Sequence, residues 1–196
     1  MLHQDCQKLD PRIRRTRQLL QDALSKLLKE KEFDKISVQD ITEAATLNRA
    51  TFYAHYTDKF ALLGELIRVD FLKLLEQRNV RFDGSCPSAF GVIILAVCDF
   101  LMQSQKAISC EQHQFSPFLE ATVIDQIRLV LLDGFKHHPV ERKIAPELIA
   151  STASWAIYGA AKQWVGNPNR VSAEEFVPTA IELVQPIMMA GVASSA

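Results

Sequence analysis

The sequence predicts an all-α protein on three observations. Apolar residues recur at steps of three, four and seven along most of the 196-residue chain, as on one side of an amphipathic helix. No segment shows a convincing strand-like alternation. Helix start and stop signals, such as Pro11 and the "GNPN" stretch, flank the periodic segments. We expect an N-terminal three-helix head, residues 1–58, and a larger helical domain, residues 59–196.

Composition and charge narrow the class of protein. The formal net charge is -1, yet residues 1–60 hold 11 Lys+Arg against 9 Asp+Glu, whereas residues 61–196 hold 11 against 14. The four cysteines form no Cys-x-x-Cys pair and have no histidine cluster at metal spacing, so we expect neither a disulfide framework nor a metal site. No apolar run reaches the length of a membrane span, and we expect a cytoplasmic protein without cofactors or membrane partners.

The head begins with a helix over about residues 12–31, whose apolar stripe includes Leu20, Leu24 and Leu27. Ser37 is a good N-cap for a second helix barely two turns long. Asn48 is the cap candidate of a third helix, which we expect to reach Tyr56. Two short helices joined by about three residues and packed under a longer one describe a helix-turn-helix unit, whose second helix enters the major groove of DNA.

One face of this second short helix carries the groups that suit DNA. With Phe52 and Tyr56 turned inward, the helical period places the other side chains outward: Arg49, Ala50, Thr51, Tyr53 and His55. An arginine can fork onto a guanine, and a threonine methyl can meet a thymine. Tyrosine and histidine suit phosphate oxygens. Each of these residues could alone be an ordinary surface side chain, but their coincidence on one face favours a DNA-binding role.

The segment "ISVQDITEAATLNRATFYAHYTDKFALL", residues 36–63, resembles the DNA-binding domain of the tetracycline-repressor (TetR) family. The resemblance implies that Asn48, Arg49, Ala50 and Thr51 contact base edges or nearby phosphates. It implies also that Tyr53, His55 and Lys59 hold the DNA backbone. Gln39 can reach a base from the first short helix, and Ser37 at its N-terminus can offer its hydroxyl and the helix dipole to a phosphate.

Two residues depart from the family's pattern. Thr46 stands where glycine is frequent, and a β-branched residue is costly if the backbone there needs a positive φ. Tyr56 stands where phenylalanine is usual, so its hydroxyl must find a partner or reach water. Neither change removes a proposed DNA contact.

Five further helices are expected after the head, the last two ending at the "GNPN" breaker and near Ala190. Their approximate ranges are residues 60–81, 89–105, 118–137, 146–165 and 172–190. The resemblance implies a homodimer in which the last two form a four-helix bundle with their copies. The expected interface residues are Ala153, Gly159, Ala160, Val177, Ile181, Val184 and Met188. The alternative is that both helices pack only inside a monomer.

The middle of the chain is where the family keeps a ligand cavity. Aromatic and apolar residues with a few polar groups are the composition expected of a small-molecule site, here for an unidentified hydrophobic effector. The candidates are Phe90, Phe100, Met102, Gln103, His113, Phe115, Phe118, Trp155 and Tyr158. Ordinary core packing is the alternative for every one of them.

These observations favour a homodimeric repressor that a small molecule releases from a palindromic operator. An enzyme has no support, since the chain lacks a Gly-x-Ser-x-Gly, a glycine-rich phosphate loop and a His-Glu-x-x-His. An effector-independent DNA-binding or nucleoid-organising module would share the head and differ only in the middle. Cys98 or Cys110 could sense oxidants, although inert burial is the simpler interpretation.

Overall fold

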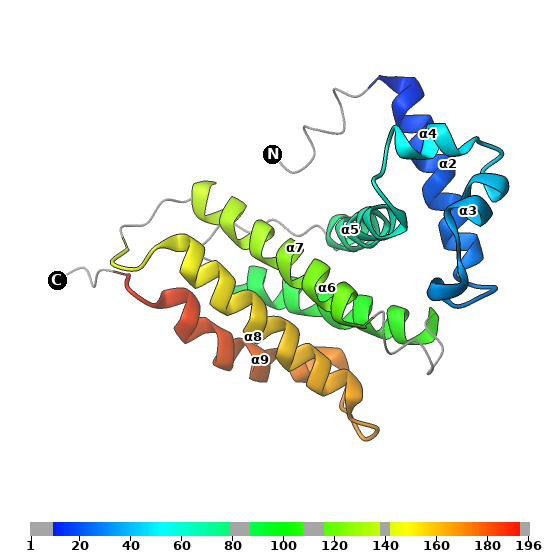
Figure 1. Cartoon of the computed structure of the whole chain (residues 1–196). Coiled ribbons are helices and arrows are strands. Elements are labelled where there is room, and N and C mark those ends of the chain that lie inside the picture. Colours follow the sequence, from blue (N-terminus) through cyan, green and yellow to red (C-terminus); the bar gives the residue numbers. More distant parts are fainter. Residues whose placement is uncertain (1–9, 79–86, 108–115, 138–141, 193–196) are drawn as a thin grey trace. The chain divides into compact units, whose positions relative to one another are not determined.

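The computed structural model describes residues 10–78, 87–107, 116–137 and 142–192, and these ranges contain eight α-helices and one short 3-10 helix. This confirms the predicted all-α class (Figure 1). The chain divides into two compact units: residues 1–69 with 107–119, and residues 70–106 with 120–196. None of the helices in the described ranges is both long and apolar enough to cross a membrane.

The first unit begins with α2, Pro11–Leu27. Asp10 caps it by accepting a hydrogen bond from the Arg12 amide at 2.8 Å, and Pro11 occupies the first turn, where its missing N–H costs nothing. The buried side of α2 includes Leu20 and Leu24, both 0% exposed. The 3-10 helix η1, Phe33–Lys35, follows and leads into α3, Val38–Ala44.

The helix-turn-helix is completed by α4, Arg49–Tyr53, and is followed by α5, Lys59–Gln77. Ile41 of α3 and Phe52 of α4 are fully buried, as is Leu62 of α5, so each element contributes at least one large side chain to the core. Asp58 begins α5 by accepting from the Ala61 amide at 2.8 Å. The division between the two units falls inside α5, after Val69.

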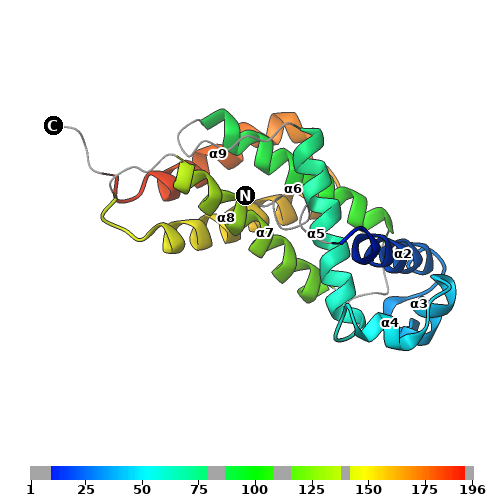
Figure 2. The ribbon, with the colours of Figure 1, turned by 90° about the horizontal axis from the view of Figure 1, so that it is seen from above.

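The second unit contains four long helices: α6, Pro87–Ala107; α7, Ser116–His137; α8, Pro146–Gly166; and α9, Ala173–Met189. Only the part of α7 from Glu120 onward belongs to it. The helices α8 and α9 lie side by side and run in opposite directions (Figure 2). A capping box between Ser172 and Glu175 starts α9, as the "SAEE" signal predicts.

Close packing holds this unit together. A Cβ at Gly91 of α6 would stand only 3.3 Å from side chains of Val177 and Ile181, so α6 and α9 approach closely at that glycine. Phe71 and Phe100 meet edge to face with ring centroids 5.6 Å apart. Ion pairs join Arg78 to Asp99 and Lys162 to Glu120.

Candidate nucleic-acid interface

The turn between α3 and α4 is made by a residue with an unusual backbone. Thr46 has φ +56°, the left-handed conformation that glycine adopts without strain. The next amide, of Leu47, donates to the Thr42 carbonyl at 2.9 Å and closes the end of α3. The turn therefore keeps the glycine-type geometry, and the departure noted in the sequence is a strained threonine.

Asn48 forms the start of α4. Its Oδ1 accepts from the Thr51 amide at 2.7 Å and from the Thr51 hydroxyl at 2.8 Å. Asn48 is therefore the N-cap, as predicted. The helix is shorter than the sequence predicts, because it ends at Tyr53, whereas we expected it to continue to Tyr56.

Phe52 determines which side of α4 faces outward. Its ring is 0% exposed and lies edge to face with Tyr53 at 5.4 Å and tilted against Tyr56 at 5.9 Å. Opposite this anchor, Arg49 and Ala50 are exposed. Tyr53 is 51% exposed, and Thr51 and His55 are partly exposed. The helix α4 and the residues directly after it thus offer a guanidinium, a phenol and an imidazole to solvent, all of which can donate hydrogen bonds to phosphates or base edges.

The hydroxyl of Tyr56 has a partner in the core. It accepts a long hydrogen bond of 3.5 Å from the Gln21 amide, and both side chains are buried. The Arg17 guanidinium lies 5.7 Å from the ring centroid. Burial raises the pKa of Tyr56 above its ordinary value. This pairing of Gln21 in α2 with Tyr56, in the link between α4 and α5, is how the chain accommodates a tyrosine at a position where the family usually has phenylalanine.

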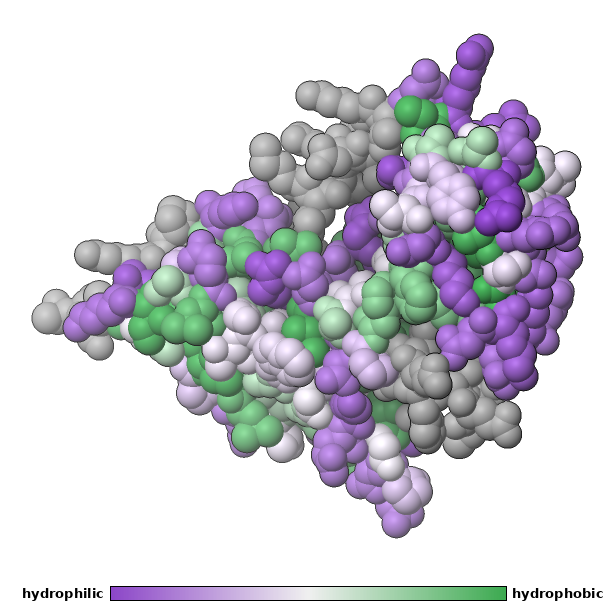
Figure 3. Space-filling view, in the orientation of Figure 1, coloured by the Kyte–Doolittle hydropathy of each residue, from purple (hydrophilic) through white to green (hydrophobic). Residues whose placement is uncertain are grey.

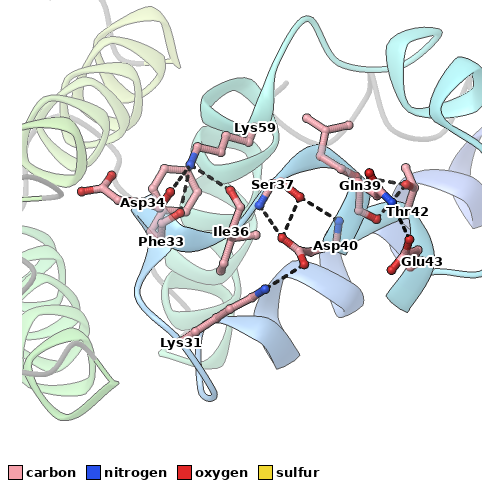
Figure 4. A network of polar contacts seen from close by, with 11 residues as sticks. Lys31, Phe33, Asp34, Ile36, Ser37, Gln39, Asp40, Thr42, Glu43 and Lys59 are labelled. Atoms are coloured by element: carbon pink, nitrogen blue, oxygen red, sulfur yellow. Dashed lines mark hydrogen bonds and ion pairs between the residues drawn. The ribbon is translucent and has the colours of Figure 1, made fainter.

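Ser37 is exposed and forms the N-cap of α3, while its phosphate contact stays a prediction. Its amide and its hydroxyl each lie 2.7 Å from Oδ2 of Asp40, and the hydroxyl accepts in turn from the Asp40 amide at 3.1 Å (Figure 4). Lys31 pairs with the same carboxylate at 2.8 Å. The hydrogen bond from Lys31, followed by those from Ser37, holds the pKa of Asp40 well below its usual range. A phosphate contact of the Ser37 hydroxyl would have to compete with its hydrogen bond to the Asp40 carboxylate.

The side chain of Gln39 remains available for a contact with DNA. It is exposed on α3, and its amide donates to the Glu43 carboxylate at 2.9 Å along the same helix. A surface contact of this kind is worth a few tenths of a kcal/mol (~0.3), so DNA could displace it at little cost.

Lys59, which the resemblance assigns to the DNA backbone, has hydrogen-bond partners within the protein. Its ammonium donates to three main-chain oxygens: Phe33 at 3.0 Å, Asp34 at 3.1 Å and Ile36 at 2.9 Å (Figure 4). An ammonium has three N–H donors, and all three are used here. A phosphate contact would have to break this arrangement. The sequence carries no local sign of it, because the acceptors lie 23 to 26 residues earlier in the chain.

The predicted pocket residues are distributed over both units. Phe90, Phe100 and Tyr158 are buried in the second unit, while Phe118 belongs to the first, where it lies 6.0 Å from Phe60, centroid to centroid. The side chain of Trp155 is 57% exposed, so it does not line an interior cavity of the protomer. Gln103 is likewise exposed, and Met102 accepts from Arg170 at 3.1 Å. His113 and Phe115 lie outside the described residues.

The predicted dimer residues are partly buried and partly exposed. Four of them are buried inside the second unit, at 8% exposure or less, and cannot supply exposed area to a partner: Ala153, Val177, Val184 and Met188. Gly159 is exposed, and Ala160 and Ile181 are partly so. The apolar stripe predicted for α9 is therefore its inner side, and most of it packs against neighbouring helices of the same chain.

Sequence reasoning missed the side chains that lie on the outer side of these helices. Large hydrophobic residues are exposed there: Leu148 at 61%, Trp155 at 57%, Leu183 at 63% and Met189 at 52%. Figure 3 shows hydrophobic and weakly polar residues gathered over α8 and α9 on this face. The spacing of Leu148, Trp155 and Gly159 by seven and four would have found the stripe on α8.

The helix α4 is capped at its start, joined to α3 by a tight turn and directs its polar face outward, with a longer helix behind it. This arrangement defines a helix-turn-helix DNA-binding protein. The sequence pattern of the bacterial regulatory proteins of the tetR family matches residues 20–66. The head of the chain therefore has the DNA-binding pattern of this family, as the resemblance implies.

Individual relatives agree. An uncharacterized HTH-type transcriptional regulator of Bacillus subtilis, YxbF, is 26% identical over 167 residues, and the match covers 68% of this chain and 44% of that protein. The chain thus spans less than half the length of this relative.

Solved structures show the same fold. A TetR transcriptional regulator of Streptococcus agalactiae is 22% identical, with TM-score 0.51 over 88% of this chain and 95% of its own. The flavonoid-responsive regulator FrrA is 20% identical, with TM-score 0.55 over 93% and 99%. RolR in complex with resorcinol is 16% identical, with TM-score 0.52 over 94% and 98%.

Proposed function

We propose that the protein is a homodimeric transcriptional repressor that binds a palindromic DNA operator and is released by a small, hydrophobic molecule. The observation that carries DNA binding is the outward face of α4, where Arg49, Ala50 and Tyr53 are exposed opposite a fully buried Phe52. Asn48, Thr51, His55 and Gln39 complete the set that we assign to the DNA.

Each residue has a role that follows from its chemistry. Arg49 and Gln39 reach base edges, since a guanidinium or an amide can make two hydrogen bonds to one base. The Thr51 methyl faces a thymine, because its hydroxyl is already used by Asn48. Tyr53 and His55 donate to phosphates and set the register of the helix on the duplex.

The dimer rests on the exposed face of α8 and α9. Two copies of this face would bury Leu148, Trp155 and Leu183 of each protomer, and exposed Gly159 lets a partner helix approach closely. Two heads would then meet successive major grooves about 34 Å apart, which is why we expect a palindromic operator.

The effector is proposed from two supports. Phe90, Phe100 and Tyr158 are buried aromatic side chains of the second unit, and two proteins of the same fold are named for a flavonoid response and for bound resorcinol. An effector-independent DNA-binding dimer is the second candidate, and it requires only the head and the α8–α9 face.

Selection of binding sites from random DNA tests the proposal. We expect recovery of an inverted repeat whose binding weakens steeply with salt, because phosphate contacts release counterions. Arg49→Ala should relax preference at one base of each half-site, at a cost of about 1–3 kcal/mol. Recovery of no inverted repeat would refute the palindromic operator. A loss of affinity that is uniform over all sequences would refute the assignment of Arg49 to a base.

A ligand screen separates the two candidates. Hydrophobic and phenolic compounds are scored by the thermal stability of the protein and by release of the selected operator. A compound that raises stability and lowers DNA affinity about 5–150-fold supports the effector-released repressor. Compounds that change neither quantity favour the effector-independent dimer.

A further inference from the structure

Lys59 is the first residue of α5, and its ammonium is the meeting point of a small internal cluster. Besides the three carbonyl oxygens of Phe33, Asp34 and Ile36, the Nζ lies 4.6 Å from the ring centroid of Phe33 and 5.8 Å from that of Phe60. The two rings meet edge to face at 5.2 Å. The charge is thus held by three dipoles and two aromatic faces of its own protein.

This cluster connects the end of the helix-turn-helix to its beginning. Ile36, whose carbonyl binds Lys59, directly precedes Ser37, the cap of α3. Lys59 itself follows α4 by a five-residue link, residues 54–58. The chain therefore runs from η1 through α3, the Thr46 turn and α4, and Lys59 ties the far end of this path back to its beginning.

The chemistry of the cluster is specific to lysine. Three N–H bonds diverge from one nitrogen, and here they meet three oxygens within 3.1 Å. A guanidinium is a flat, wider fork, so arginine would keep the positive charge but could not place its donors on the same three oxygens.

We propose that Lys59 is a positioning residue for DNA recognition: it holds the end of the α4 segment against the entrance to α3, and it makes no contact with a phosphate. The inference rests on the proposed DNA-binding function and adds a residue that determines the angle at which α4 meets the groove. A side chain that binds a phosphate would contribute its charge to DNA affinity, whereas Lys59 contributes the position of α4.

Three variants of the full-length protein test this role: Lys59→Met, Lys59→Arg and the control Lys29→Met. Lys29 is an exposed lysine in the turn after α2, so the control removes one positive charge and leaves the cluster intact. Affinities for the selected operator and for a scrambled duplex are measured over a range of salt concentrations, at a temperature where circular dichroism shows each variant folded.

We expect Lys59→Met and Lys59→Arg to lose operator affinity alike, by about tenfold or more, the loss caused by misplacing one base contact. The ratio of operator to scrambled affinity should fall. The slope of log affinity against log salt should stay as in the wild type. The fall in the ratio separates this role from a loss of folded protein, which would lower both affinities by the same factor. Lys29→Met should keep the operator preference.

A phosphate role gives the opposite pattern. Lys59→Met would then reduce the salt slope by about 0.9 per lost contact, and Lys59→Arg would bind nearly as the wild type does. Either result overturns the proposal. If Lys59→Met does not fold, Lys59→Arg alone decides, since it retains charge and length. Failure of the wild-type protein to select any operator would instead refute the proposed function.

Discussion

Thr46 shows the cost of a tight turn at a single residue. Its φ of +56° puts a β-branched side chain in the left-handed region, where crowding of Cβ costs about 1–3 kcal/mol. The residue is exposed, so its side chain contributes little packing in return. The short link between α3 and α4 requires the conformation whatever residue occupies it.

Replacing this threonine should therefore stabilise the protein. We expect Thr46→Gly to raise the free energy of unfolding by about 1 kcal/mol, the relief of strain less the greater entropy of glycine in the unfolded chain. Urea unfolding followed by circular dichroism measures it. Thr46→Ala should fall between the two, because it removes the branch and keeps the Cβ. A less stable Thr46→Gly would show that the turn is not strained.

Cys98 makes stability depend on alkaline pH. The thiol is 0% exposed, and burial, followed by the neighbouring Asp99 carboxylate, raises its pKa from 9.0 to about 12. Its thiolate is therefore scarce at neutral pH, which speaks against the redox-sensing alternative at this position. Cys110, the other candidate, lies outside the described residues.

The sign of the effect follows from the direction of this shift. Between pH 9 and 12 the unfolded chain has lost a proton that the folded protein keeps, so stability is complete below pH 9 and declines as the pH rises. We expect the wild type to lose more stability between pH 8 and 10 than Cys98→Val, which has no thiol. Urea unfolding at both pH values measures this, and equal losses would contradict the assignment.

At the scale of elements, local signals predicted most of the head. Ser37, Asn48 and Asp58 are helix caps whose bonds span three residues, and all three begin helices in the structure. The end of α4 was predicted too late because the apolar pair Phe52 and Tyr56 is buried whether or not the helix continues between them. The periodicity of apolar residues indicates which side chains are buried, and it indicates a helix only indirectly.

The site was less predictable where distant residues meet. Lys59 follows the family's pattern, but its acceptors come from η1 and from Ile36 directly after it, a turn that periodicity does not reveal. Ser37 was correctly predicted as a cap, and its predicted phosphate contact would compete with the hydrogen bonds of that cap. An atom that caps a helix has few donors left for a ligand.

Substitutions of Asn48 can separate its role as the cap of α4 from its proposed contact with DNA. Asn48→Ala should destabilise the protein by about 1 kcal/mol and weaken operator binding, because α4 has only five residues. Asn48→Asp should keep the cap and the stability, yet still weaken binding, since it brings a negative charge to the DNA. Parallel unfolding and operator-binding measurements distinguish the two effects. Unchanged binding by Asn48→Asp would place Asn48 away from the duplex.

For the whole molecule, the sequence could predict two long amphipathic helices at the C-terminal end but not which side of each faces out. The α9 stripe of Val177, Val184 and Met188 is the more regular one, and it packs internally. The outer side carries fewer apolar residues, at 52–63% exposure, mixed with polar ones. An interface used only after folding has to remain compatible with water, and this weakens its periodic signal.

The strongest test of the assembly is a charge placed on that outer side. Trp155→Glu should convert the dimer into a monomer, because pairing α8 with its copy would bury an unpaired carboxylate near a second one. Light scattering should show the mass halved. Affinity for the full palindrome should fall at least about a hundredfold, since the second head no longer binds as part of the same molecule, while binding to a half-site changes little. Val171→Glu is the matched control, because Val171 is 53% exposed but lies in the connection between α8 and α9. A dimer that survives Trp155→Glu, or that Val171→Glu disrupts equally, would place the interface elsewhere on the protein.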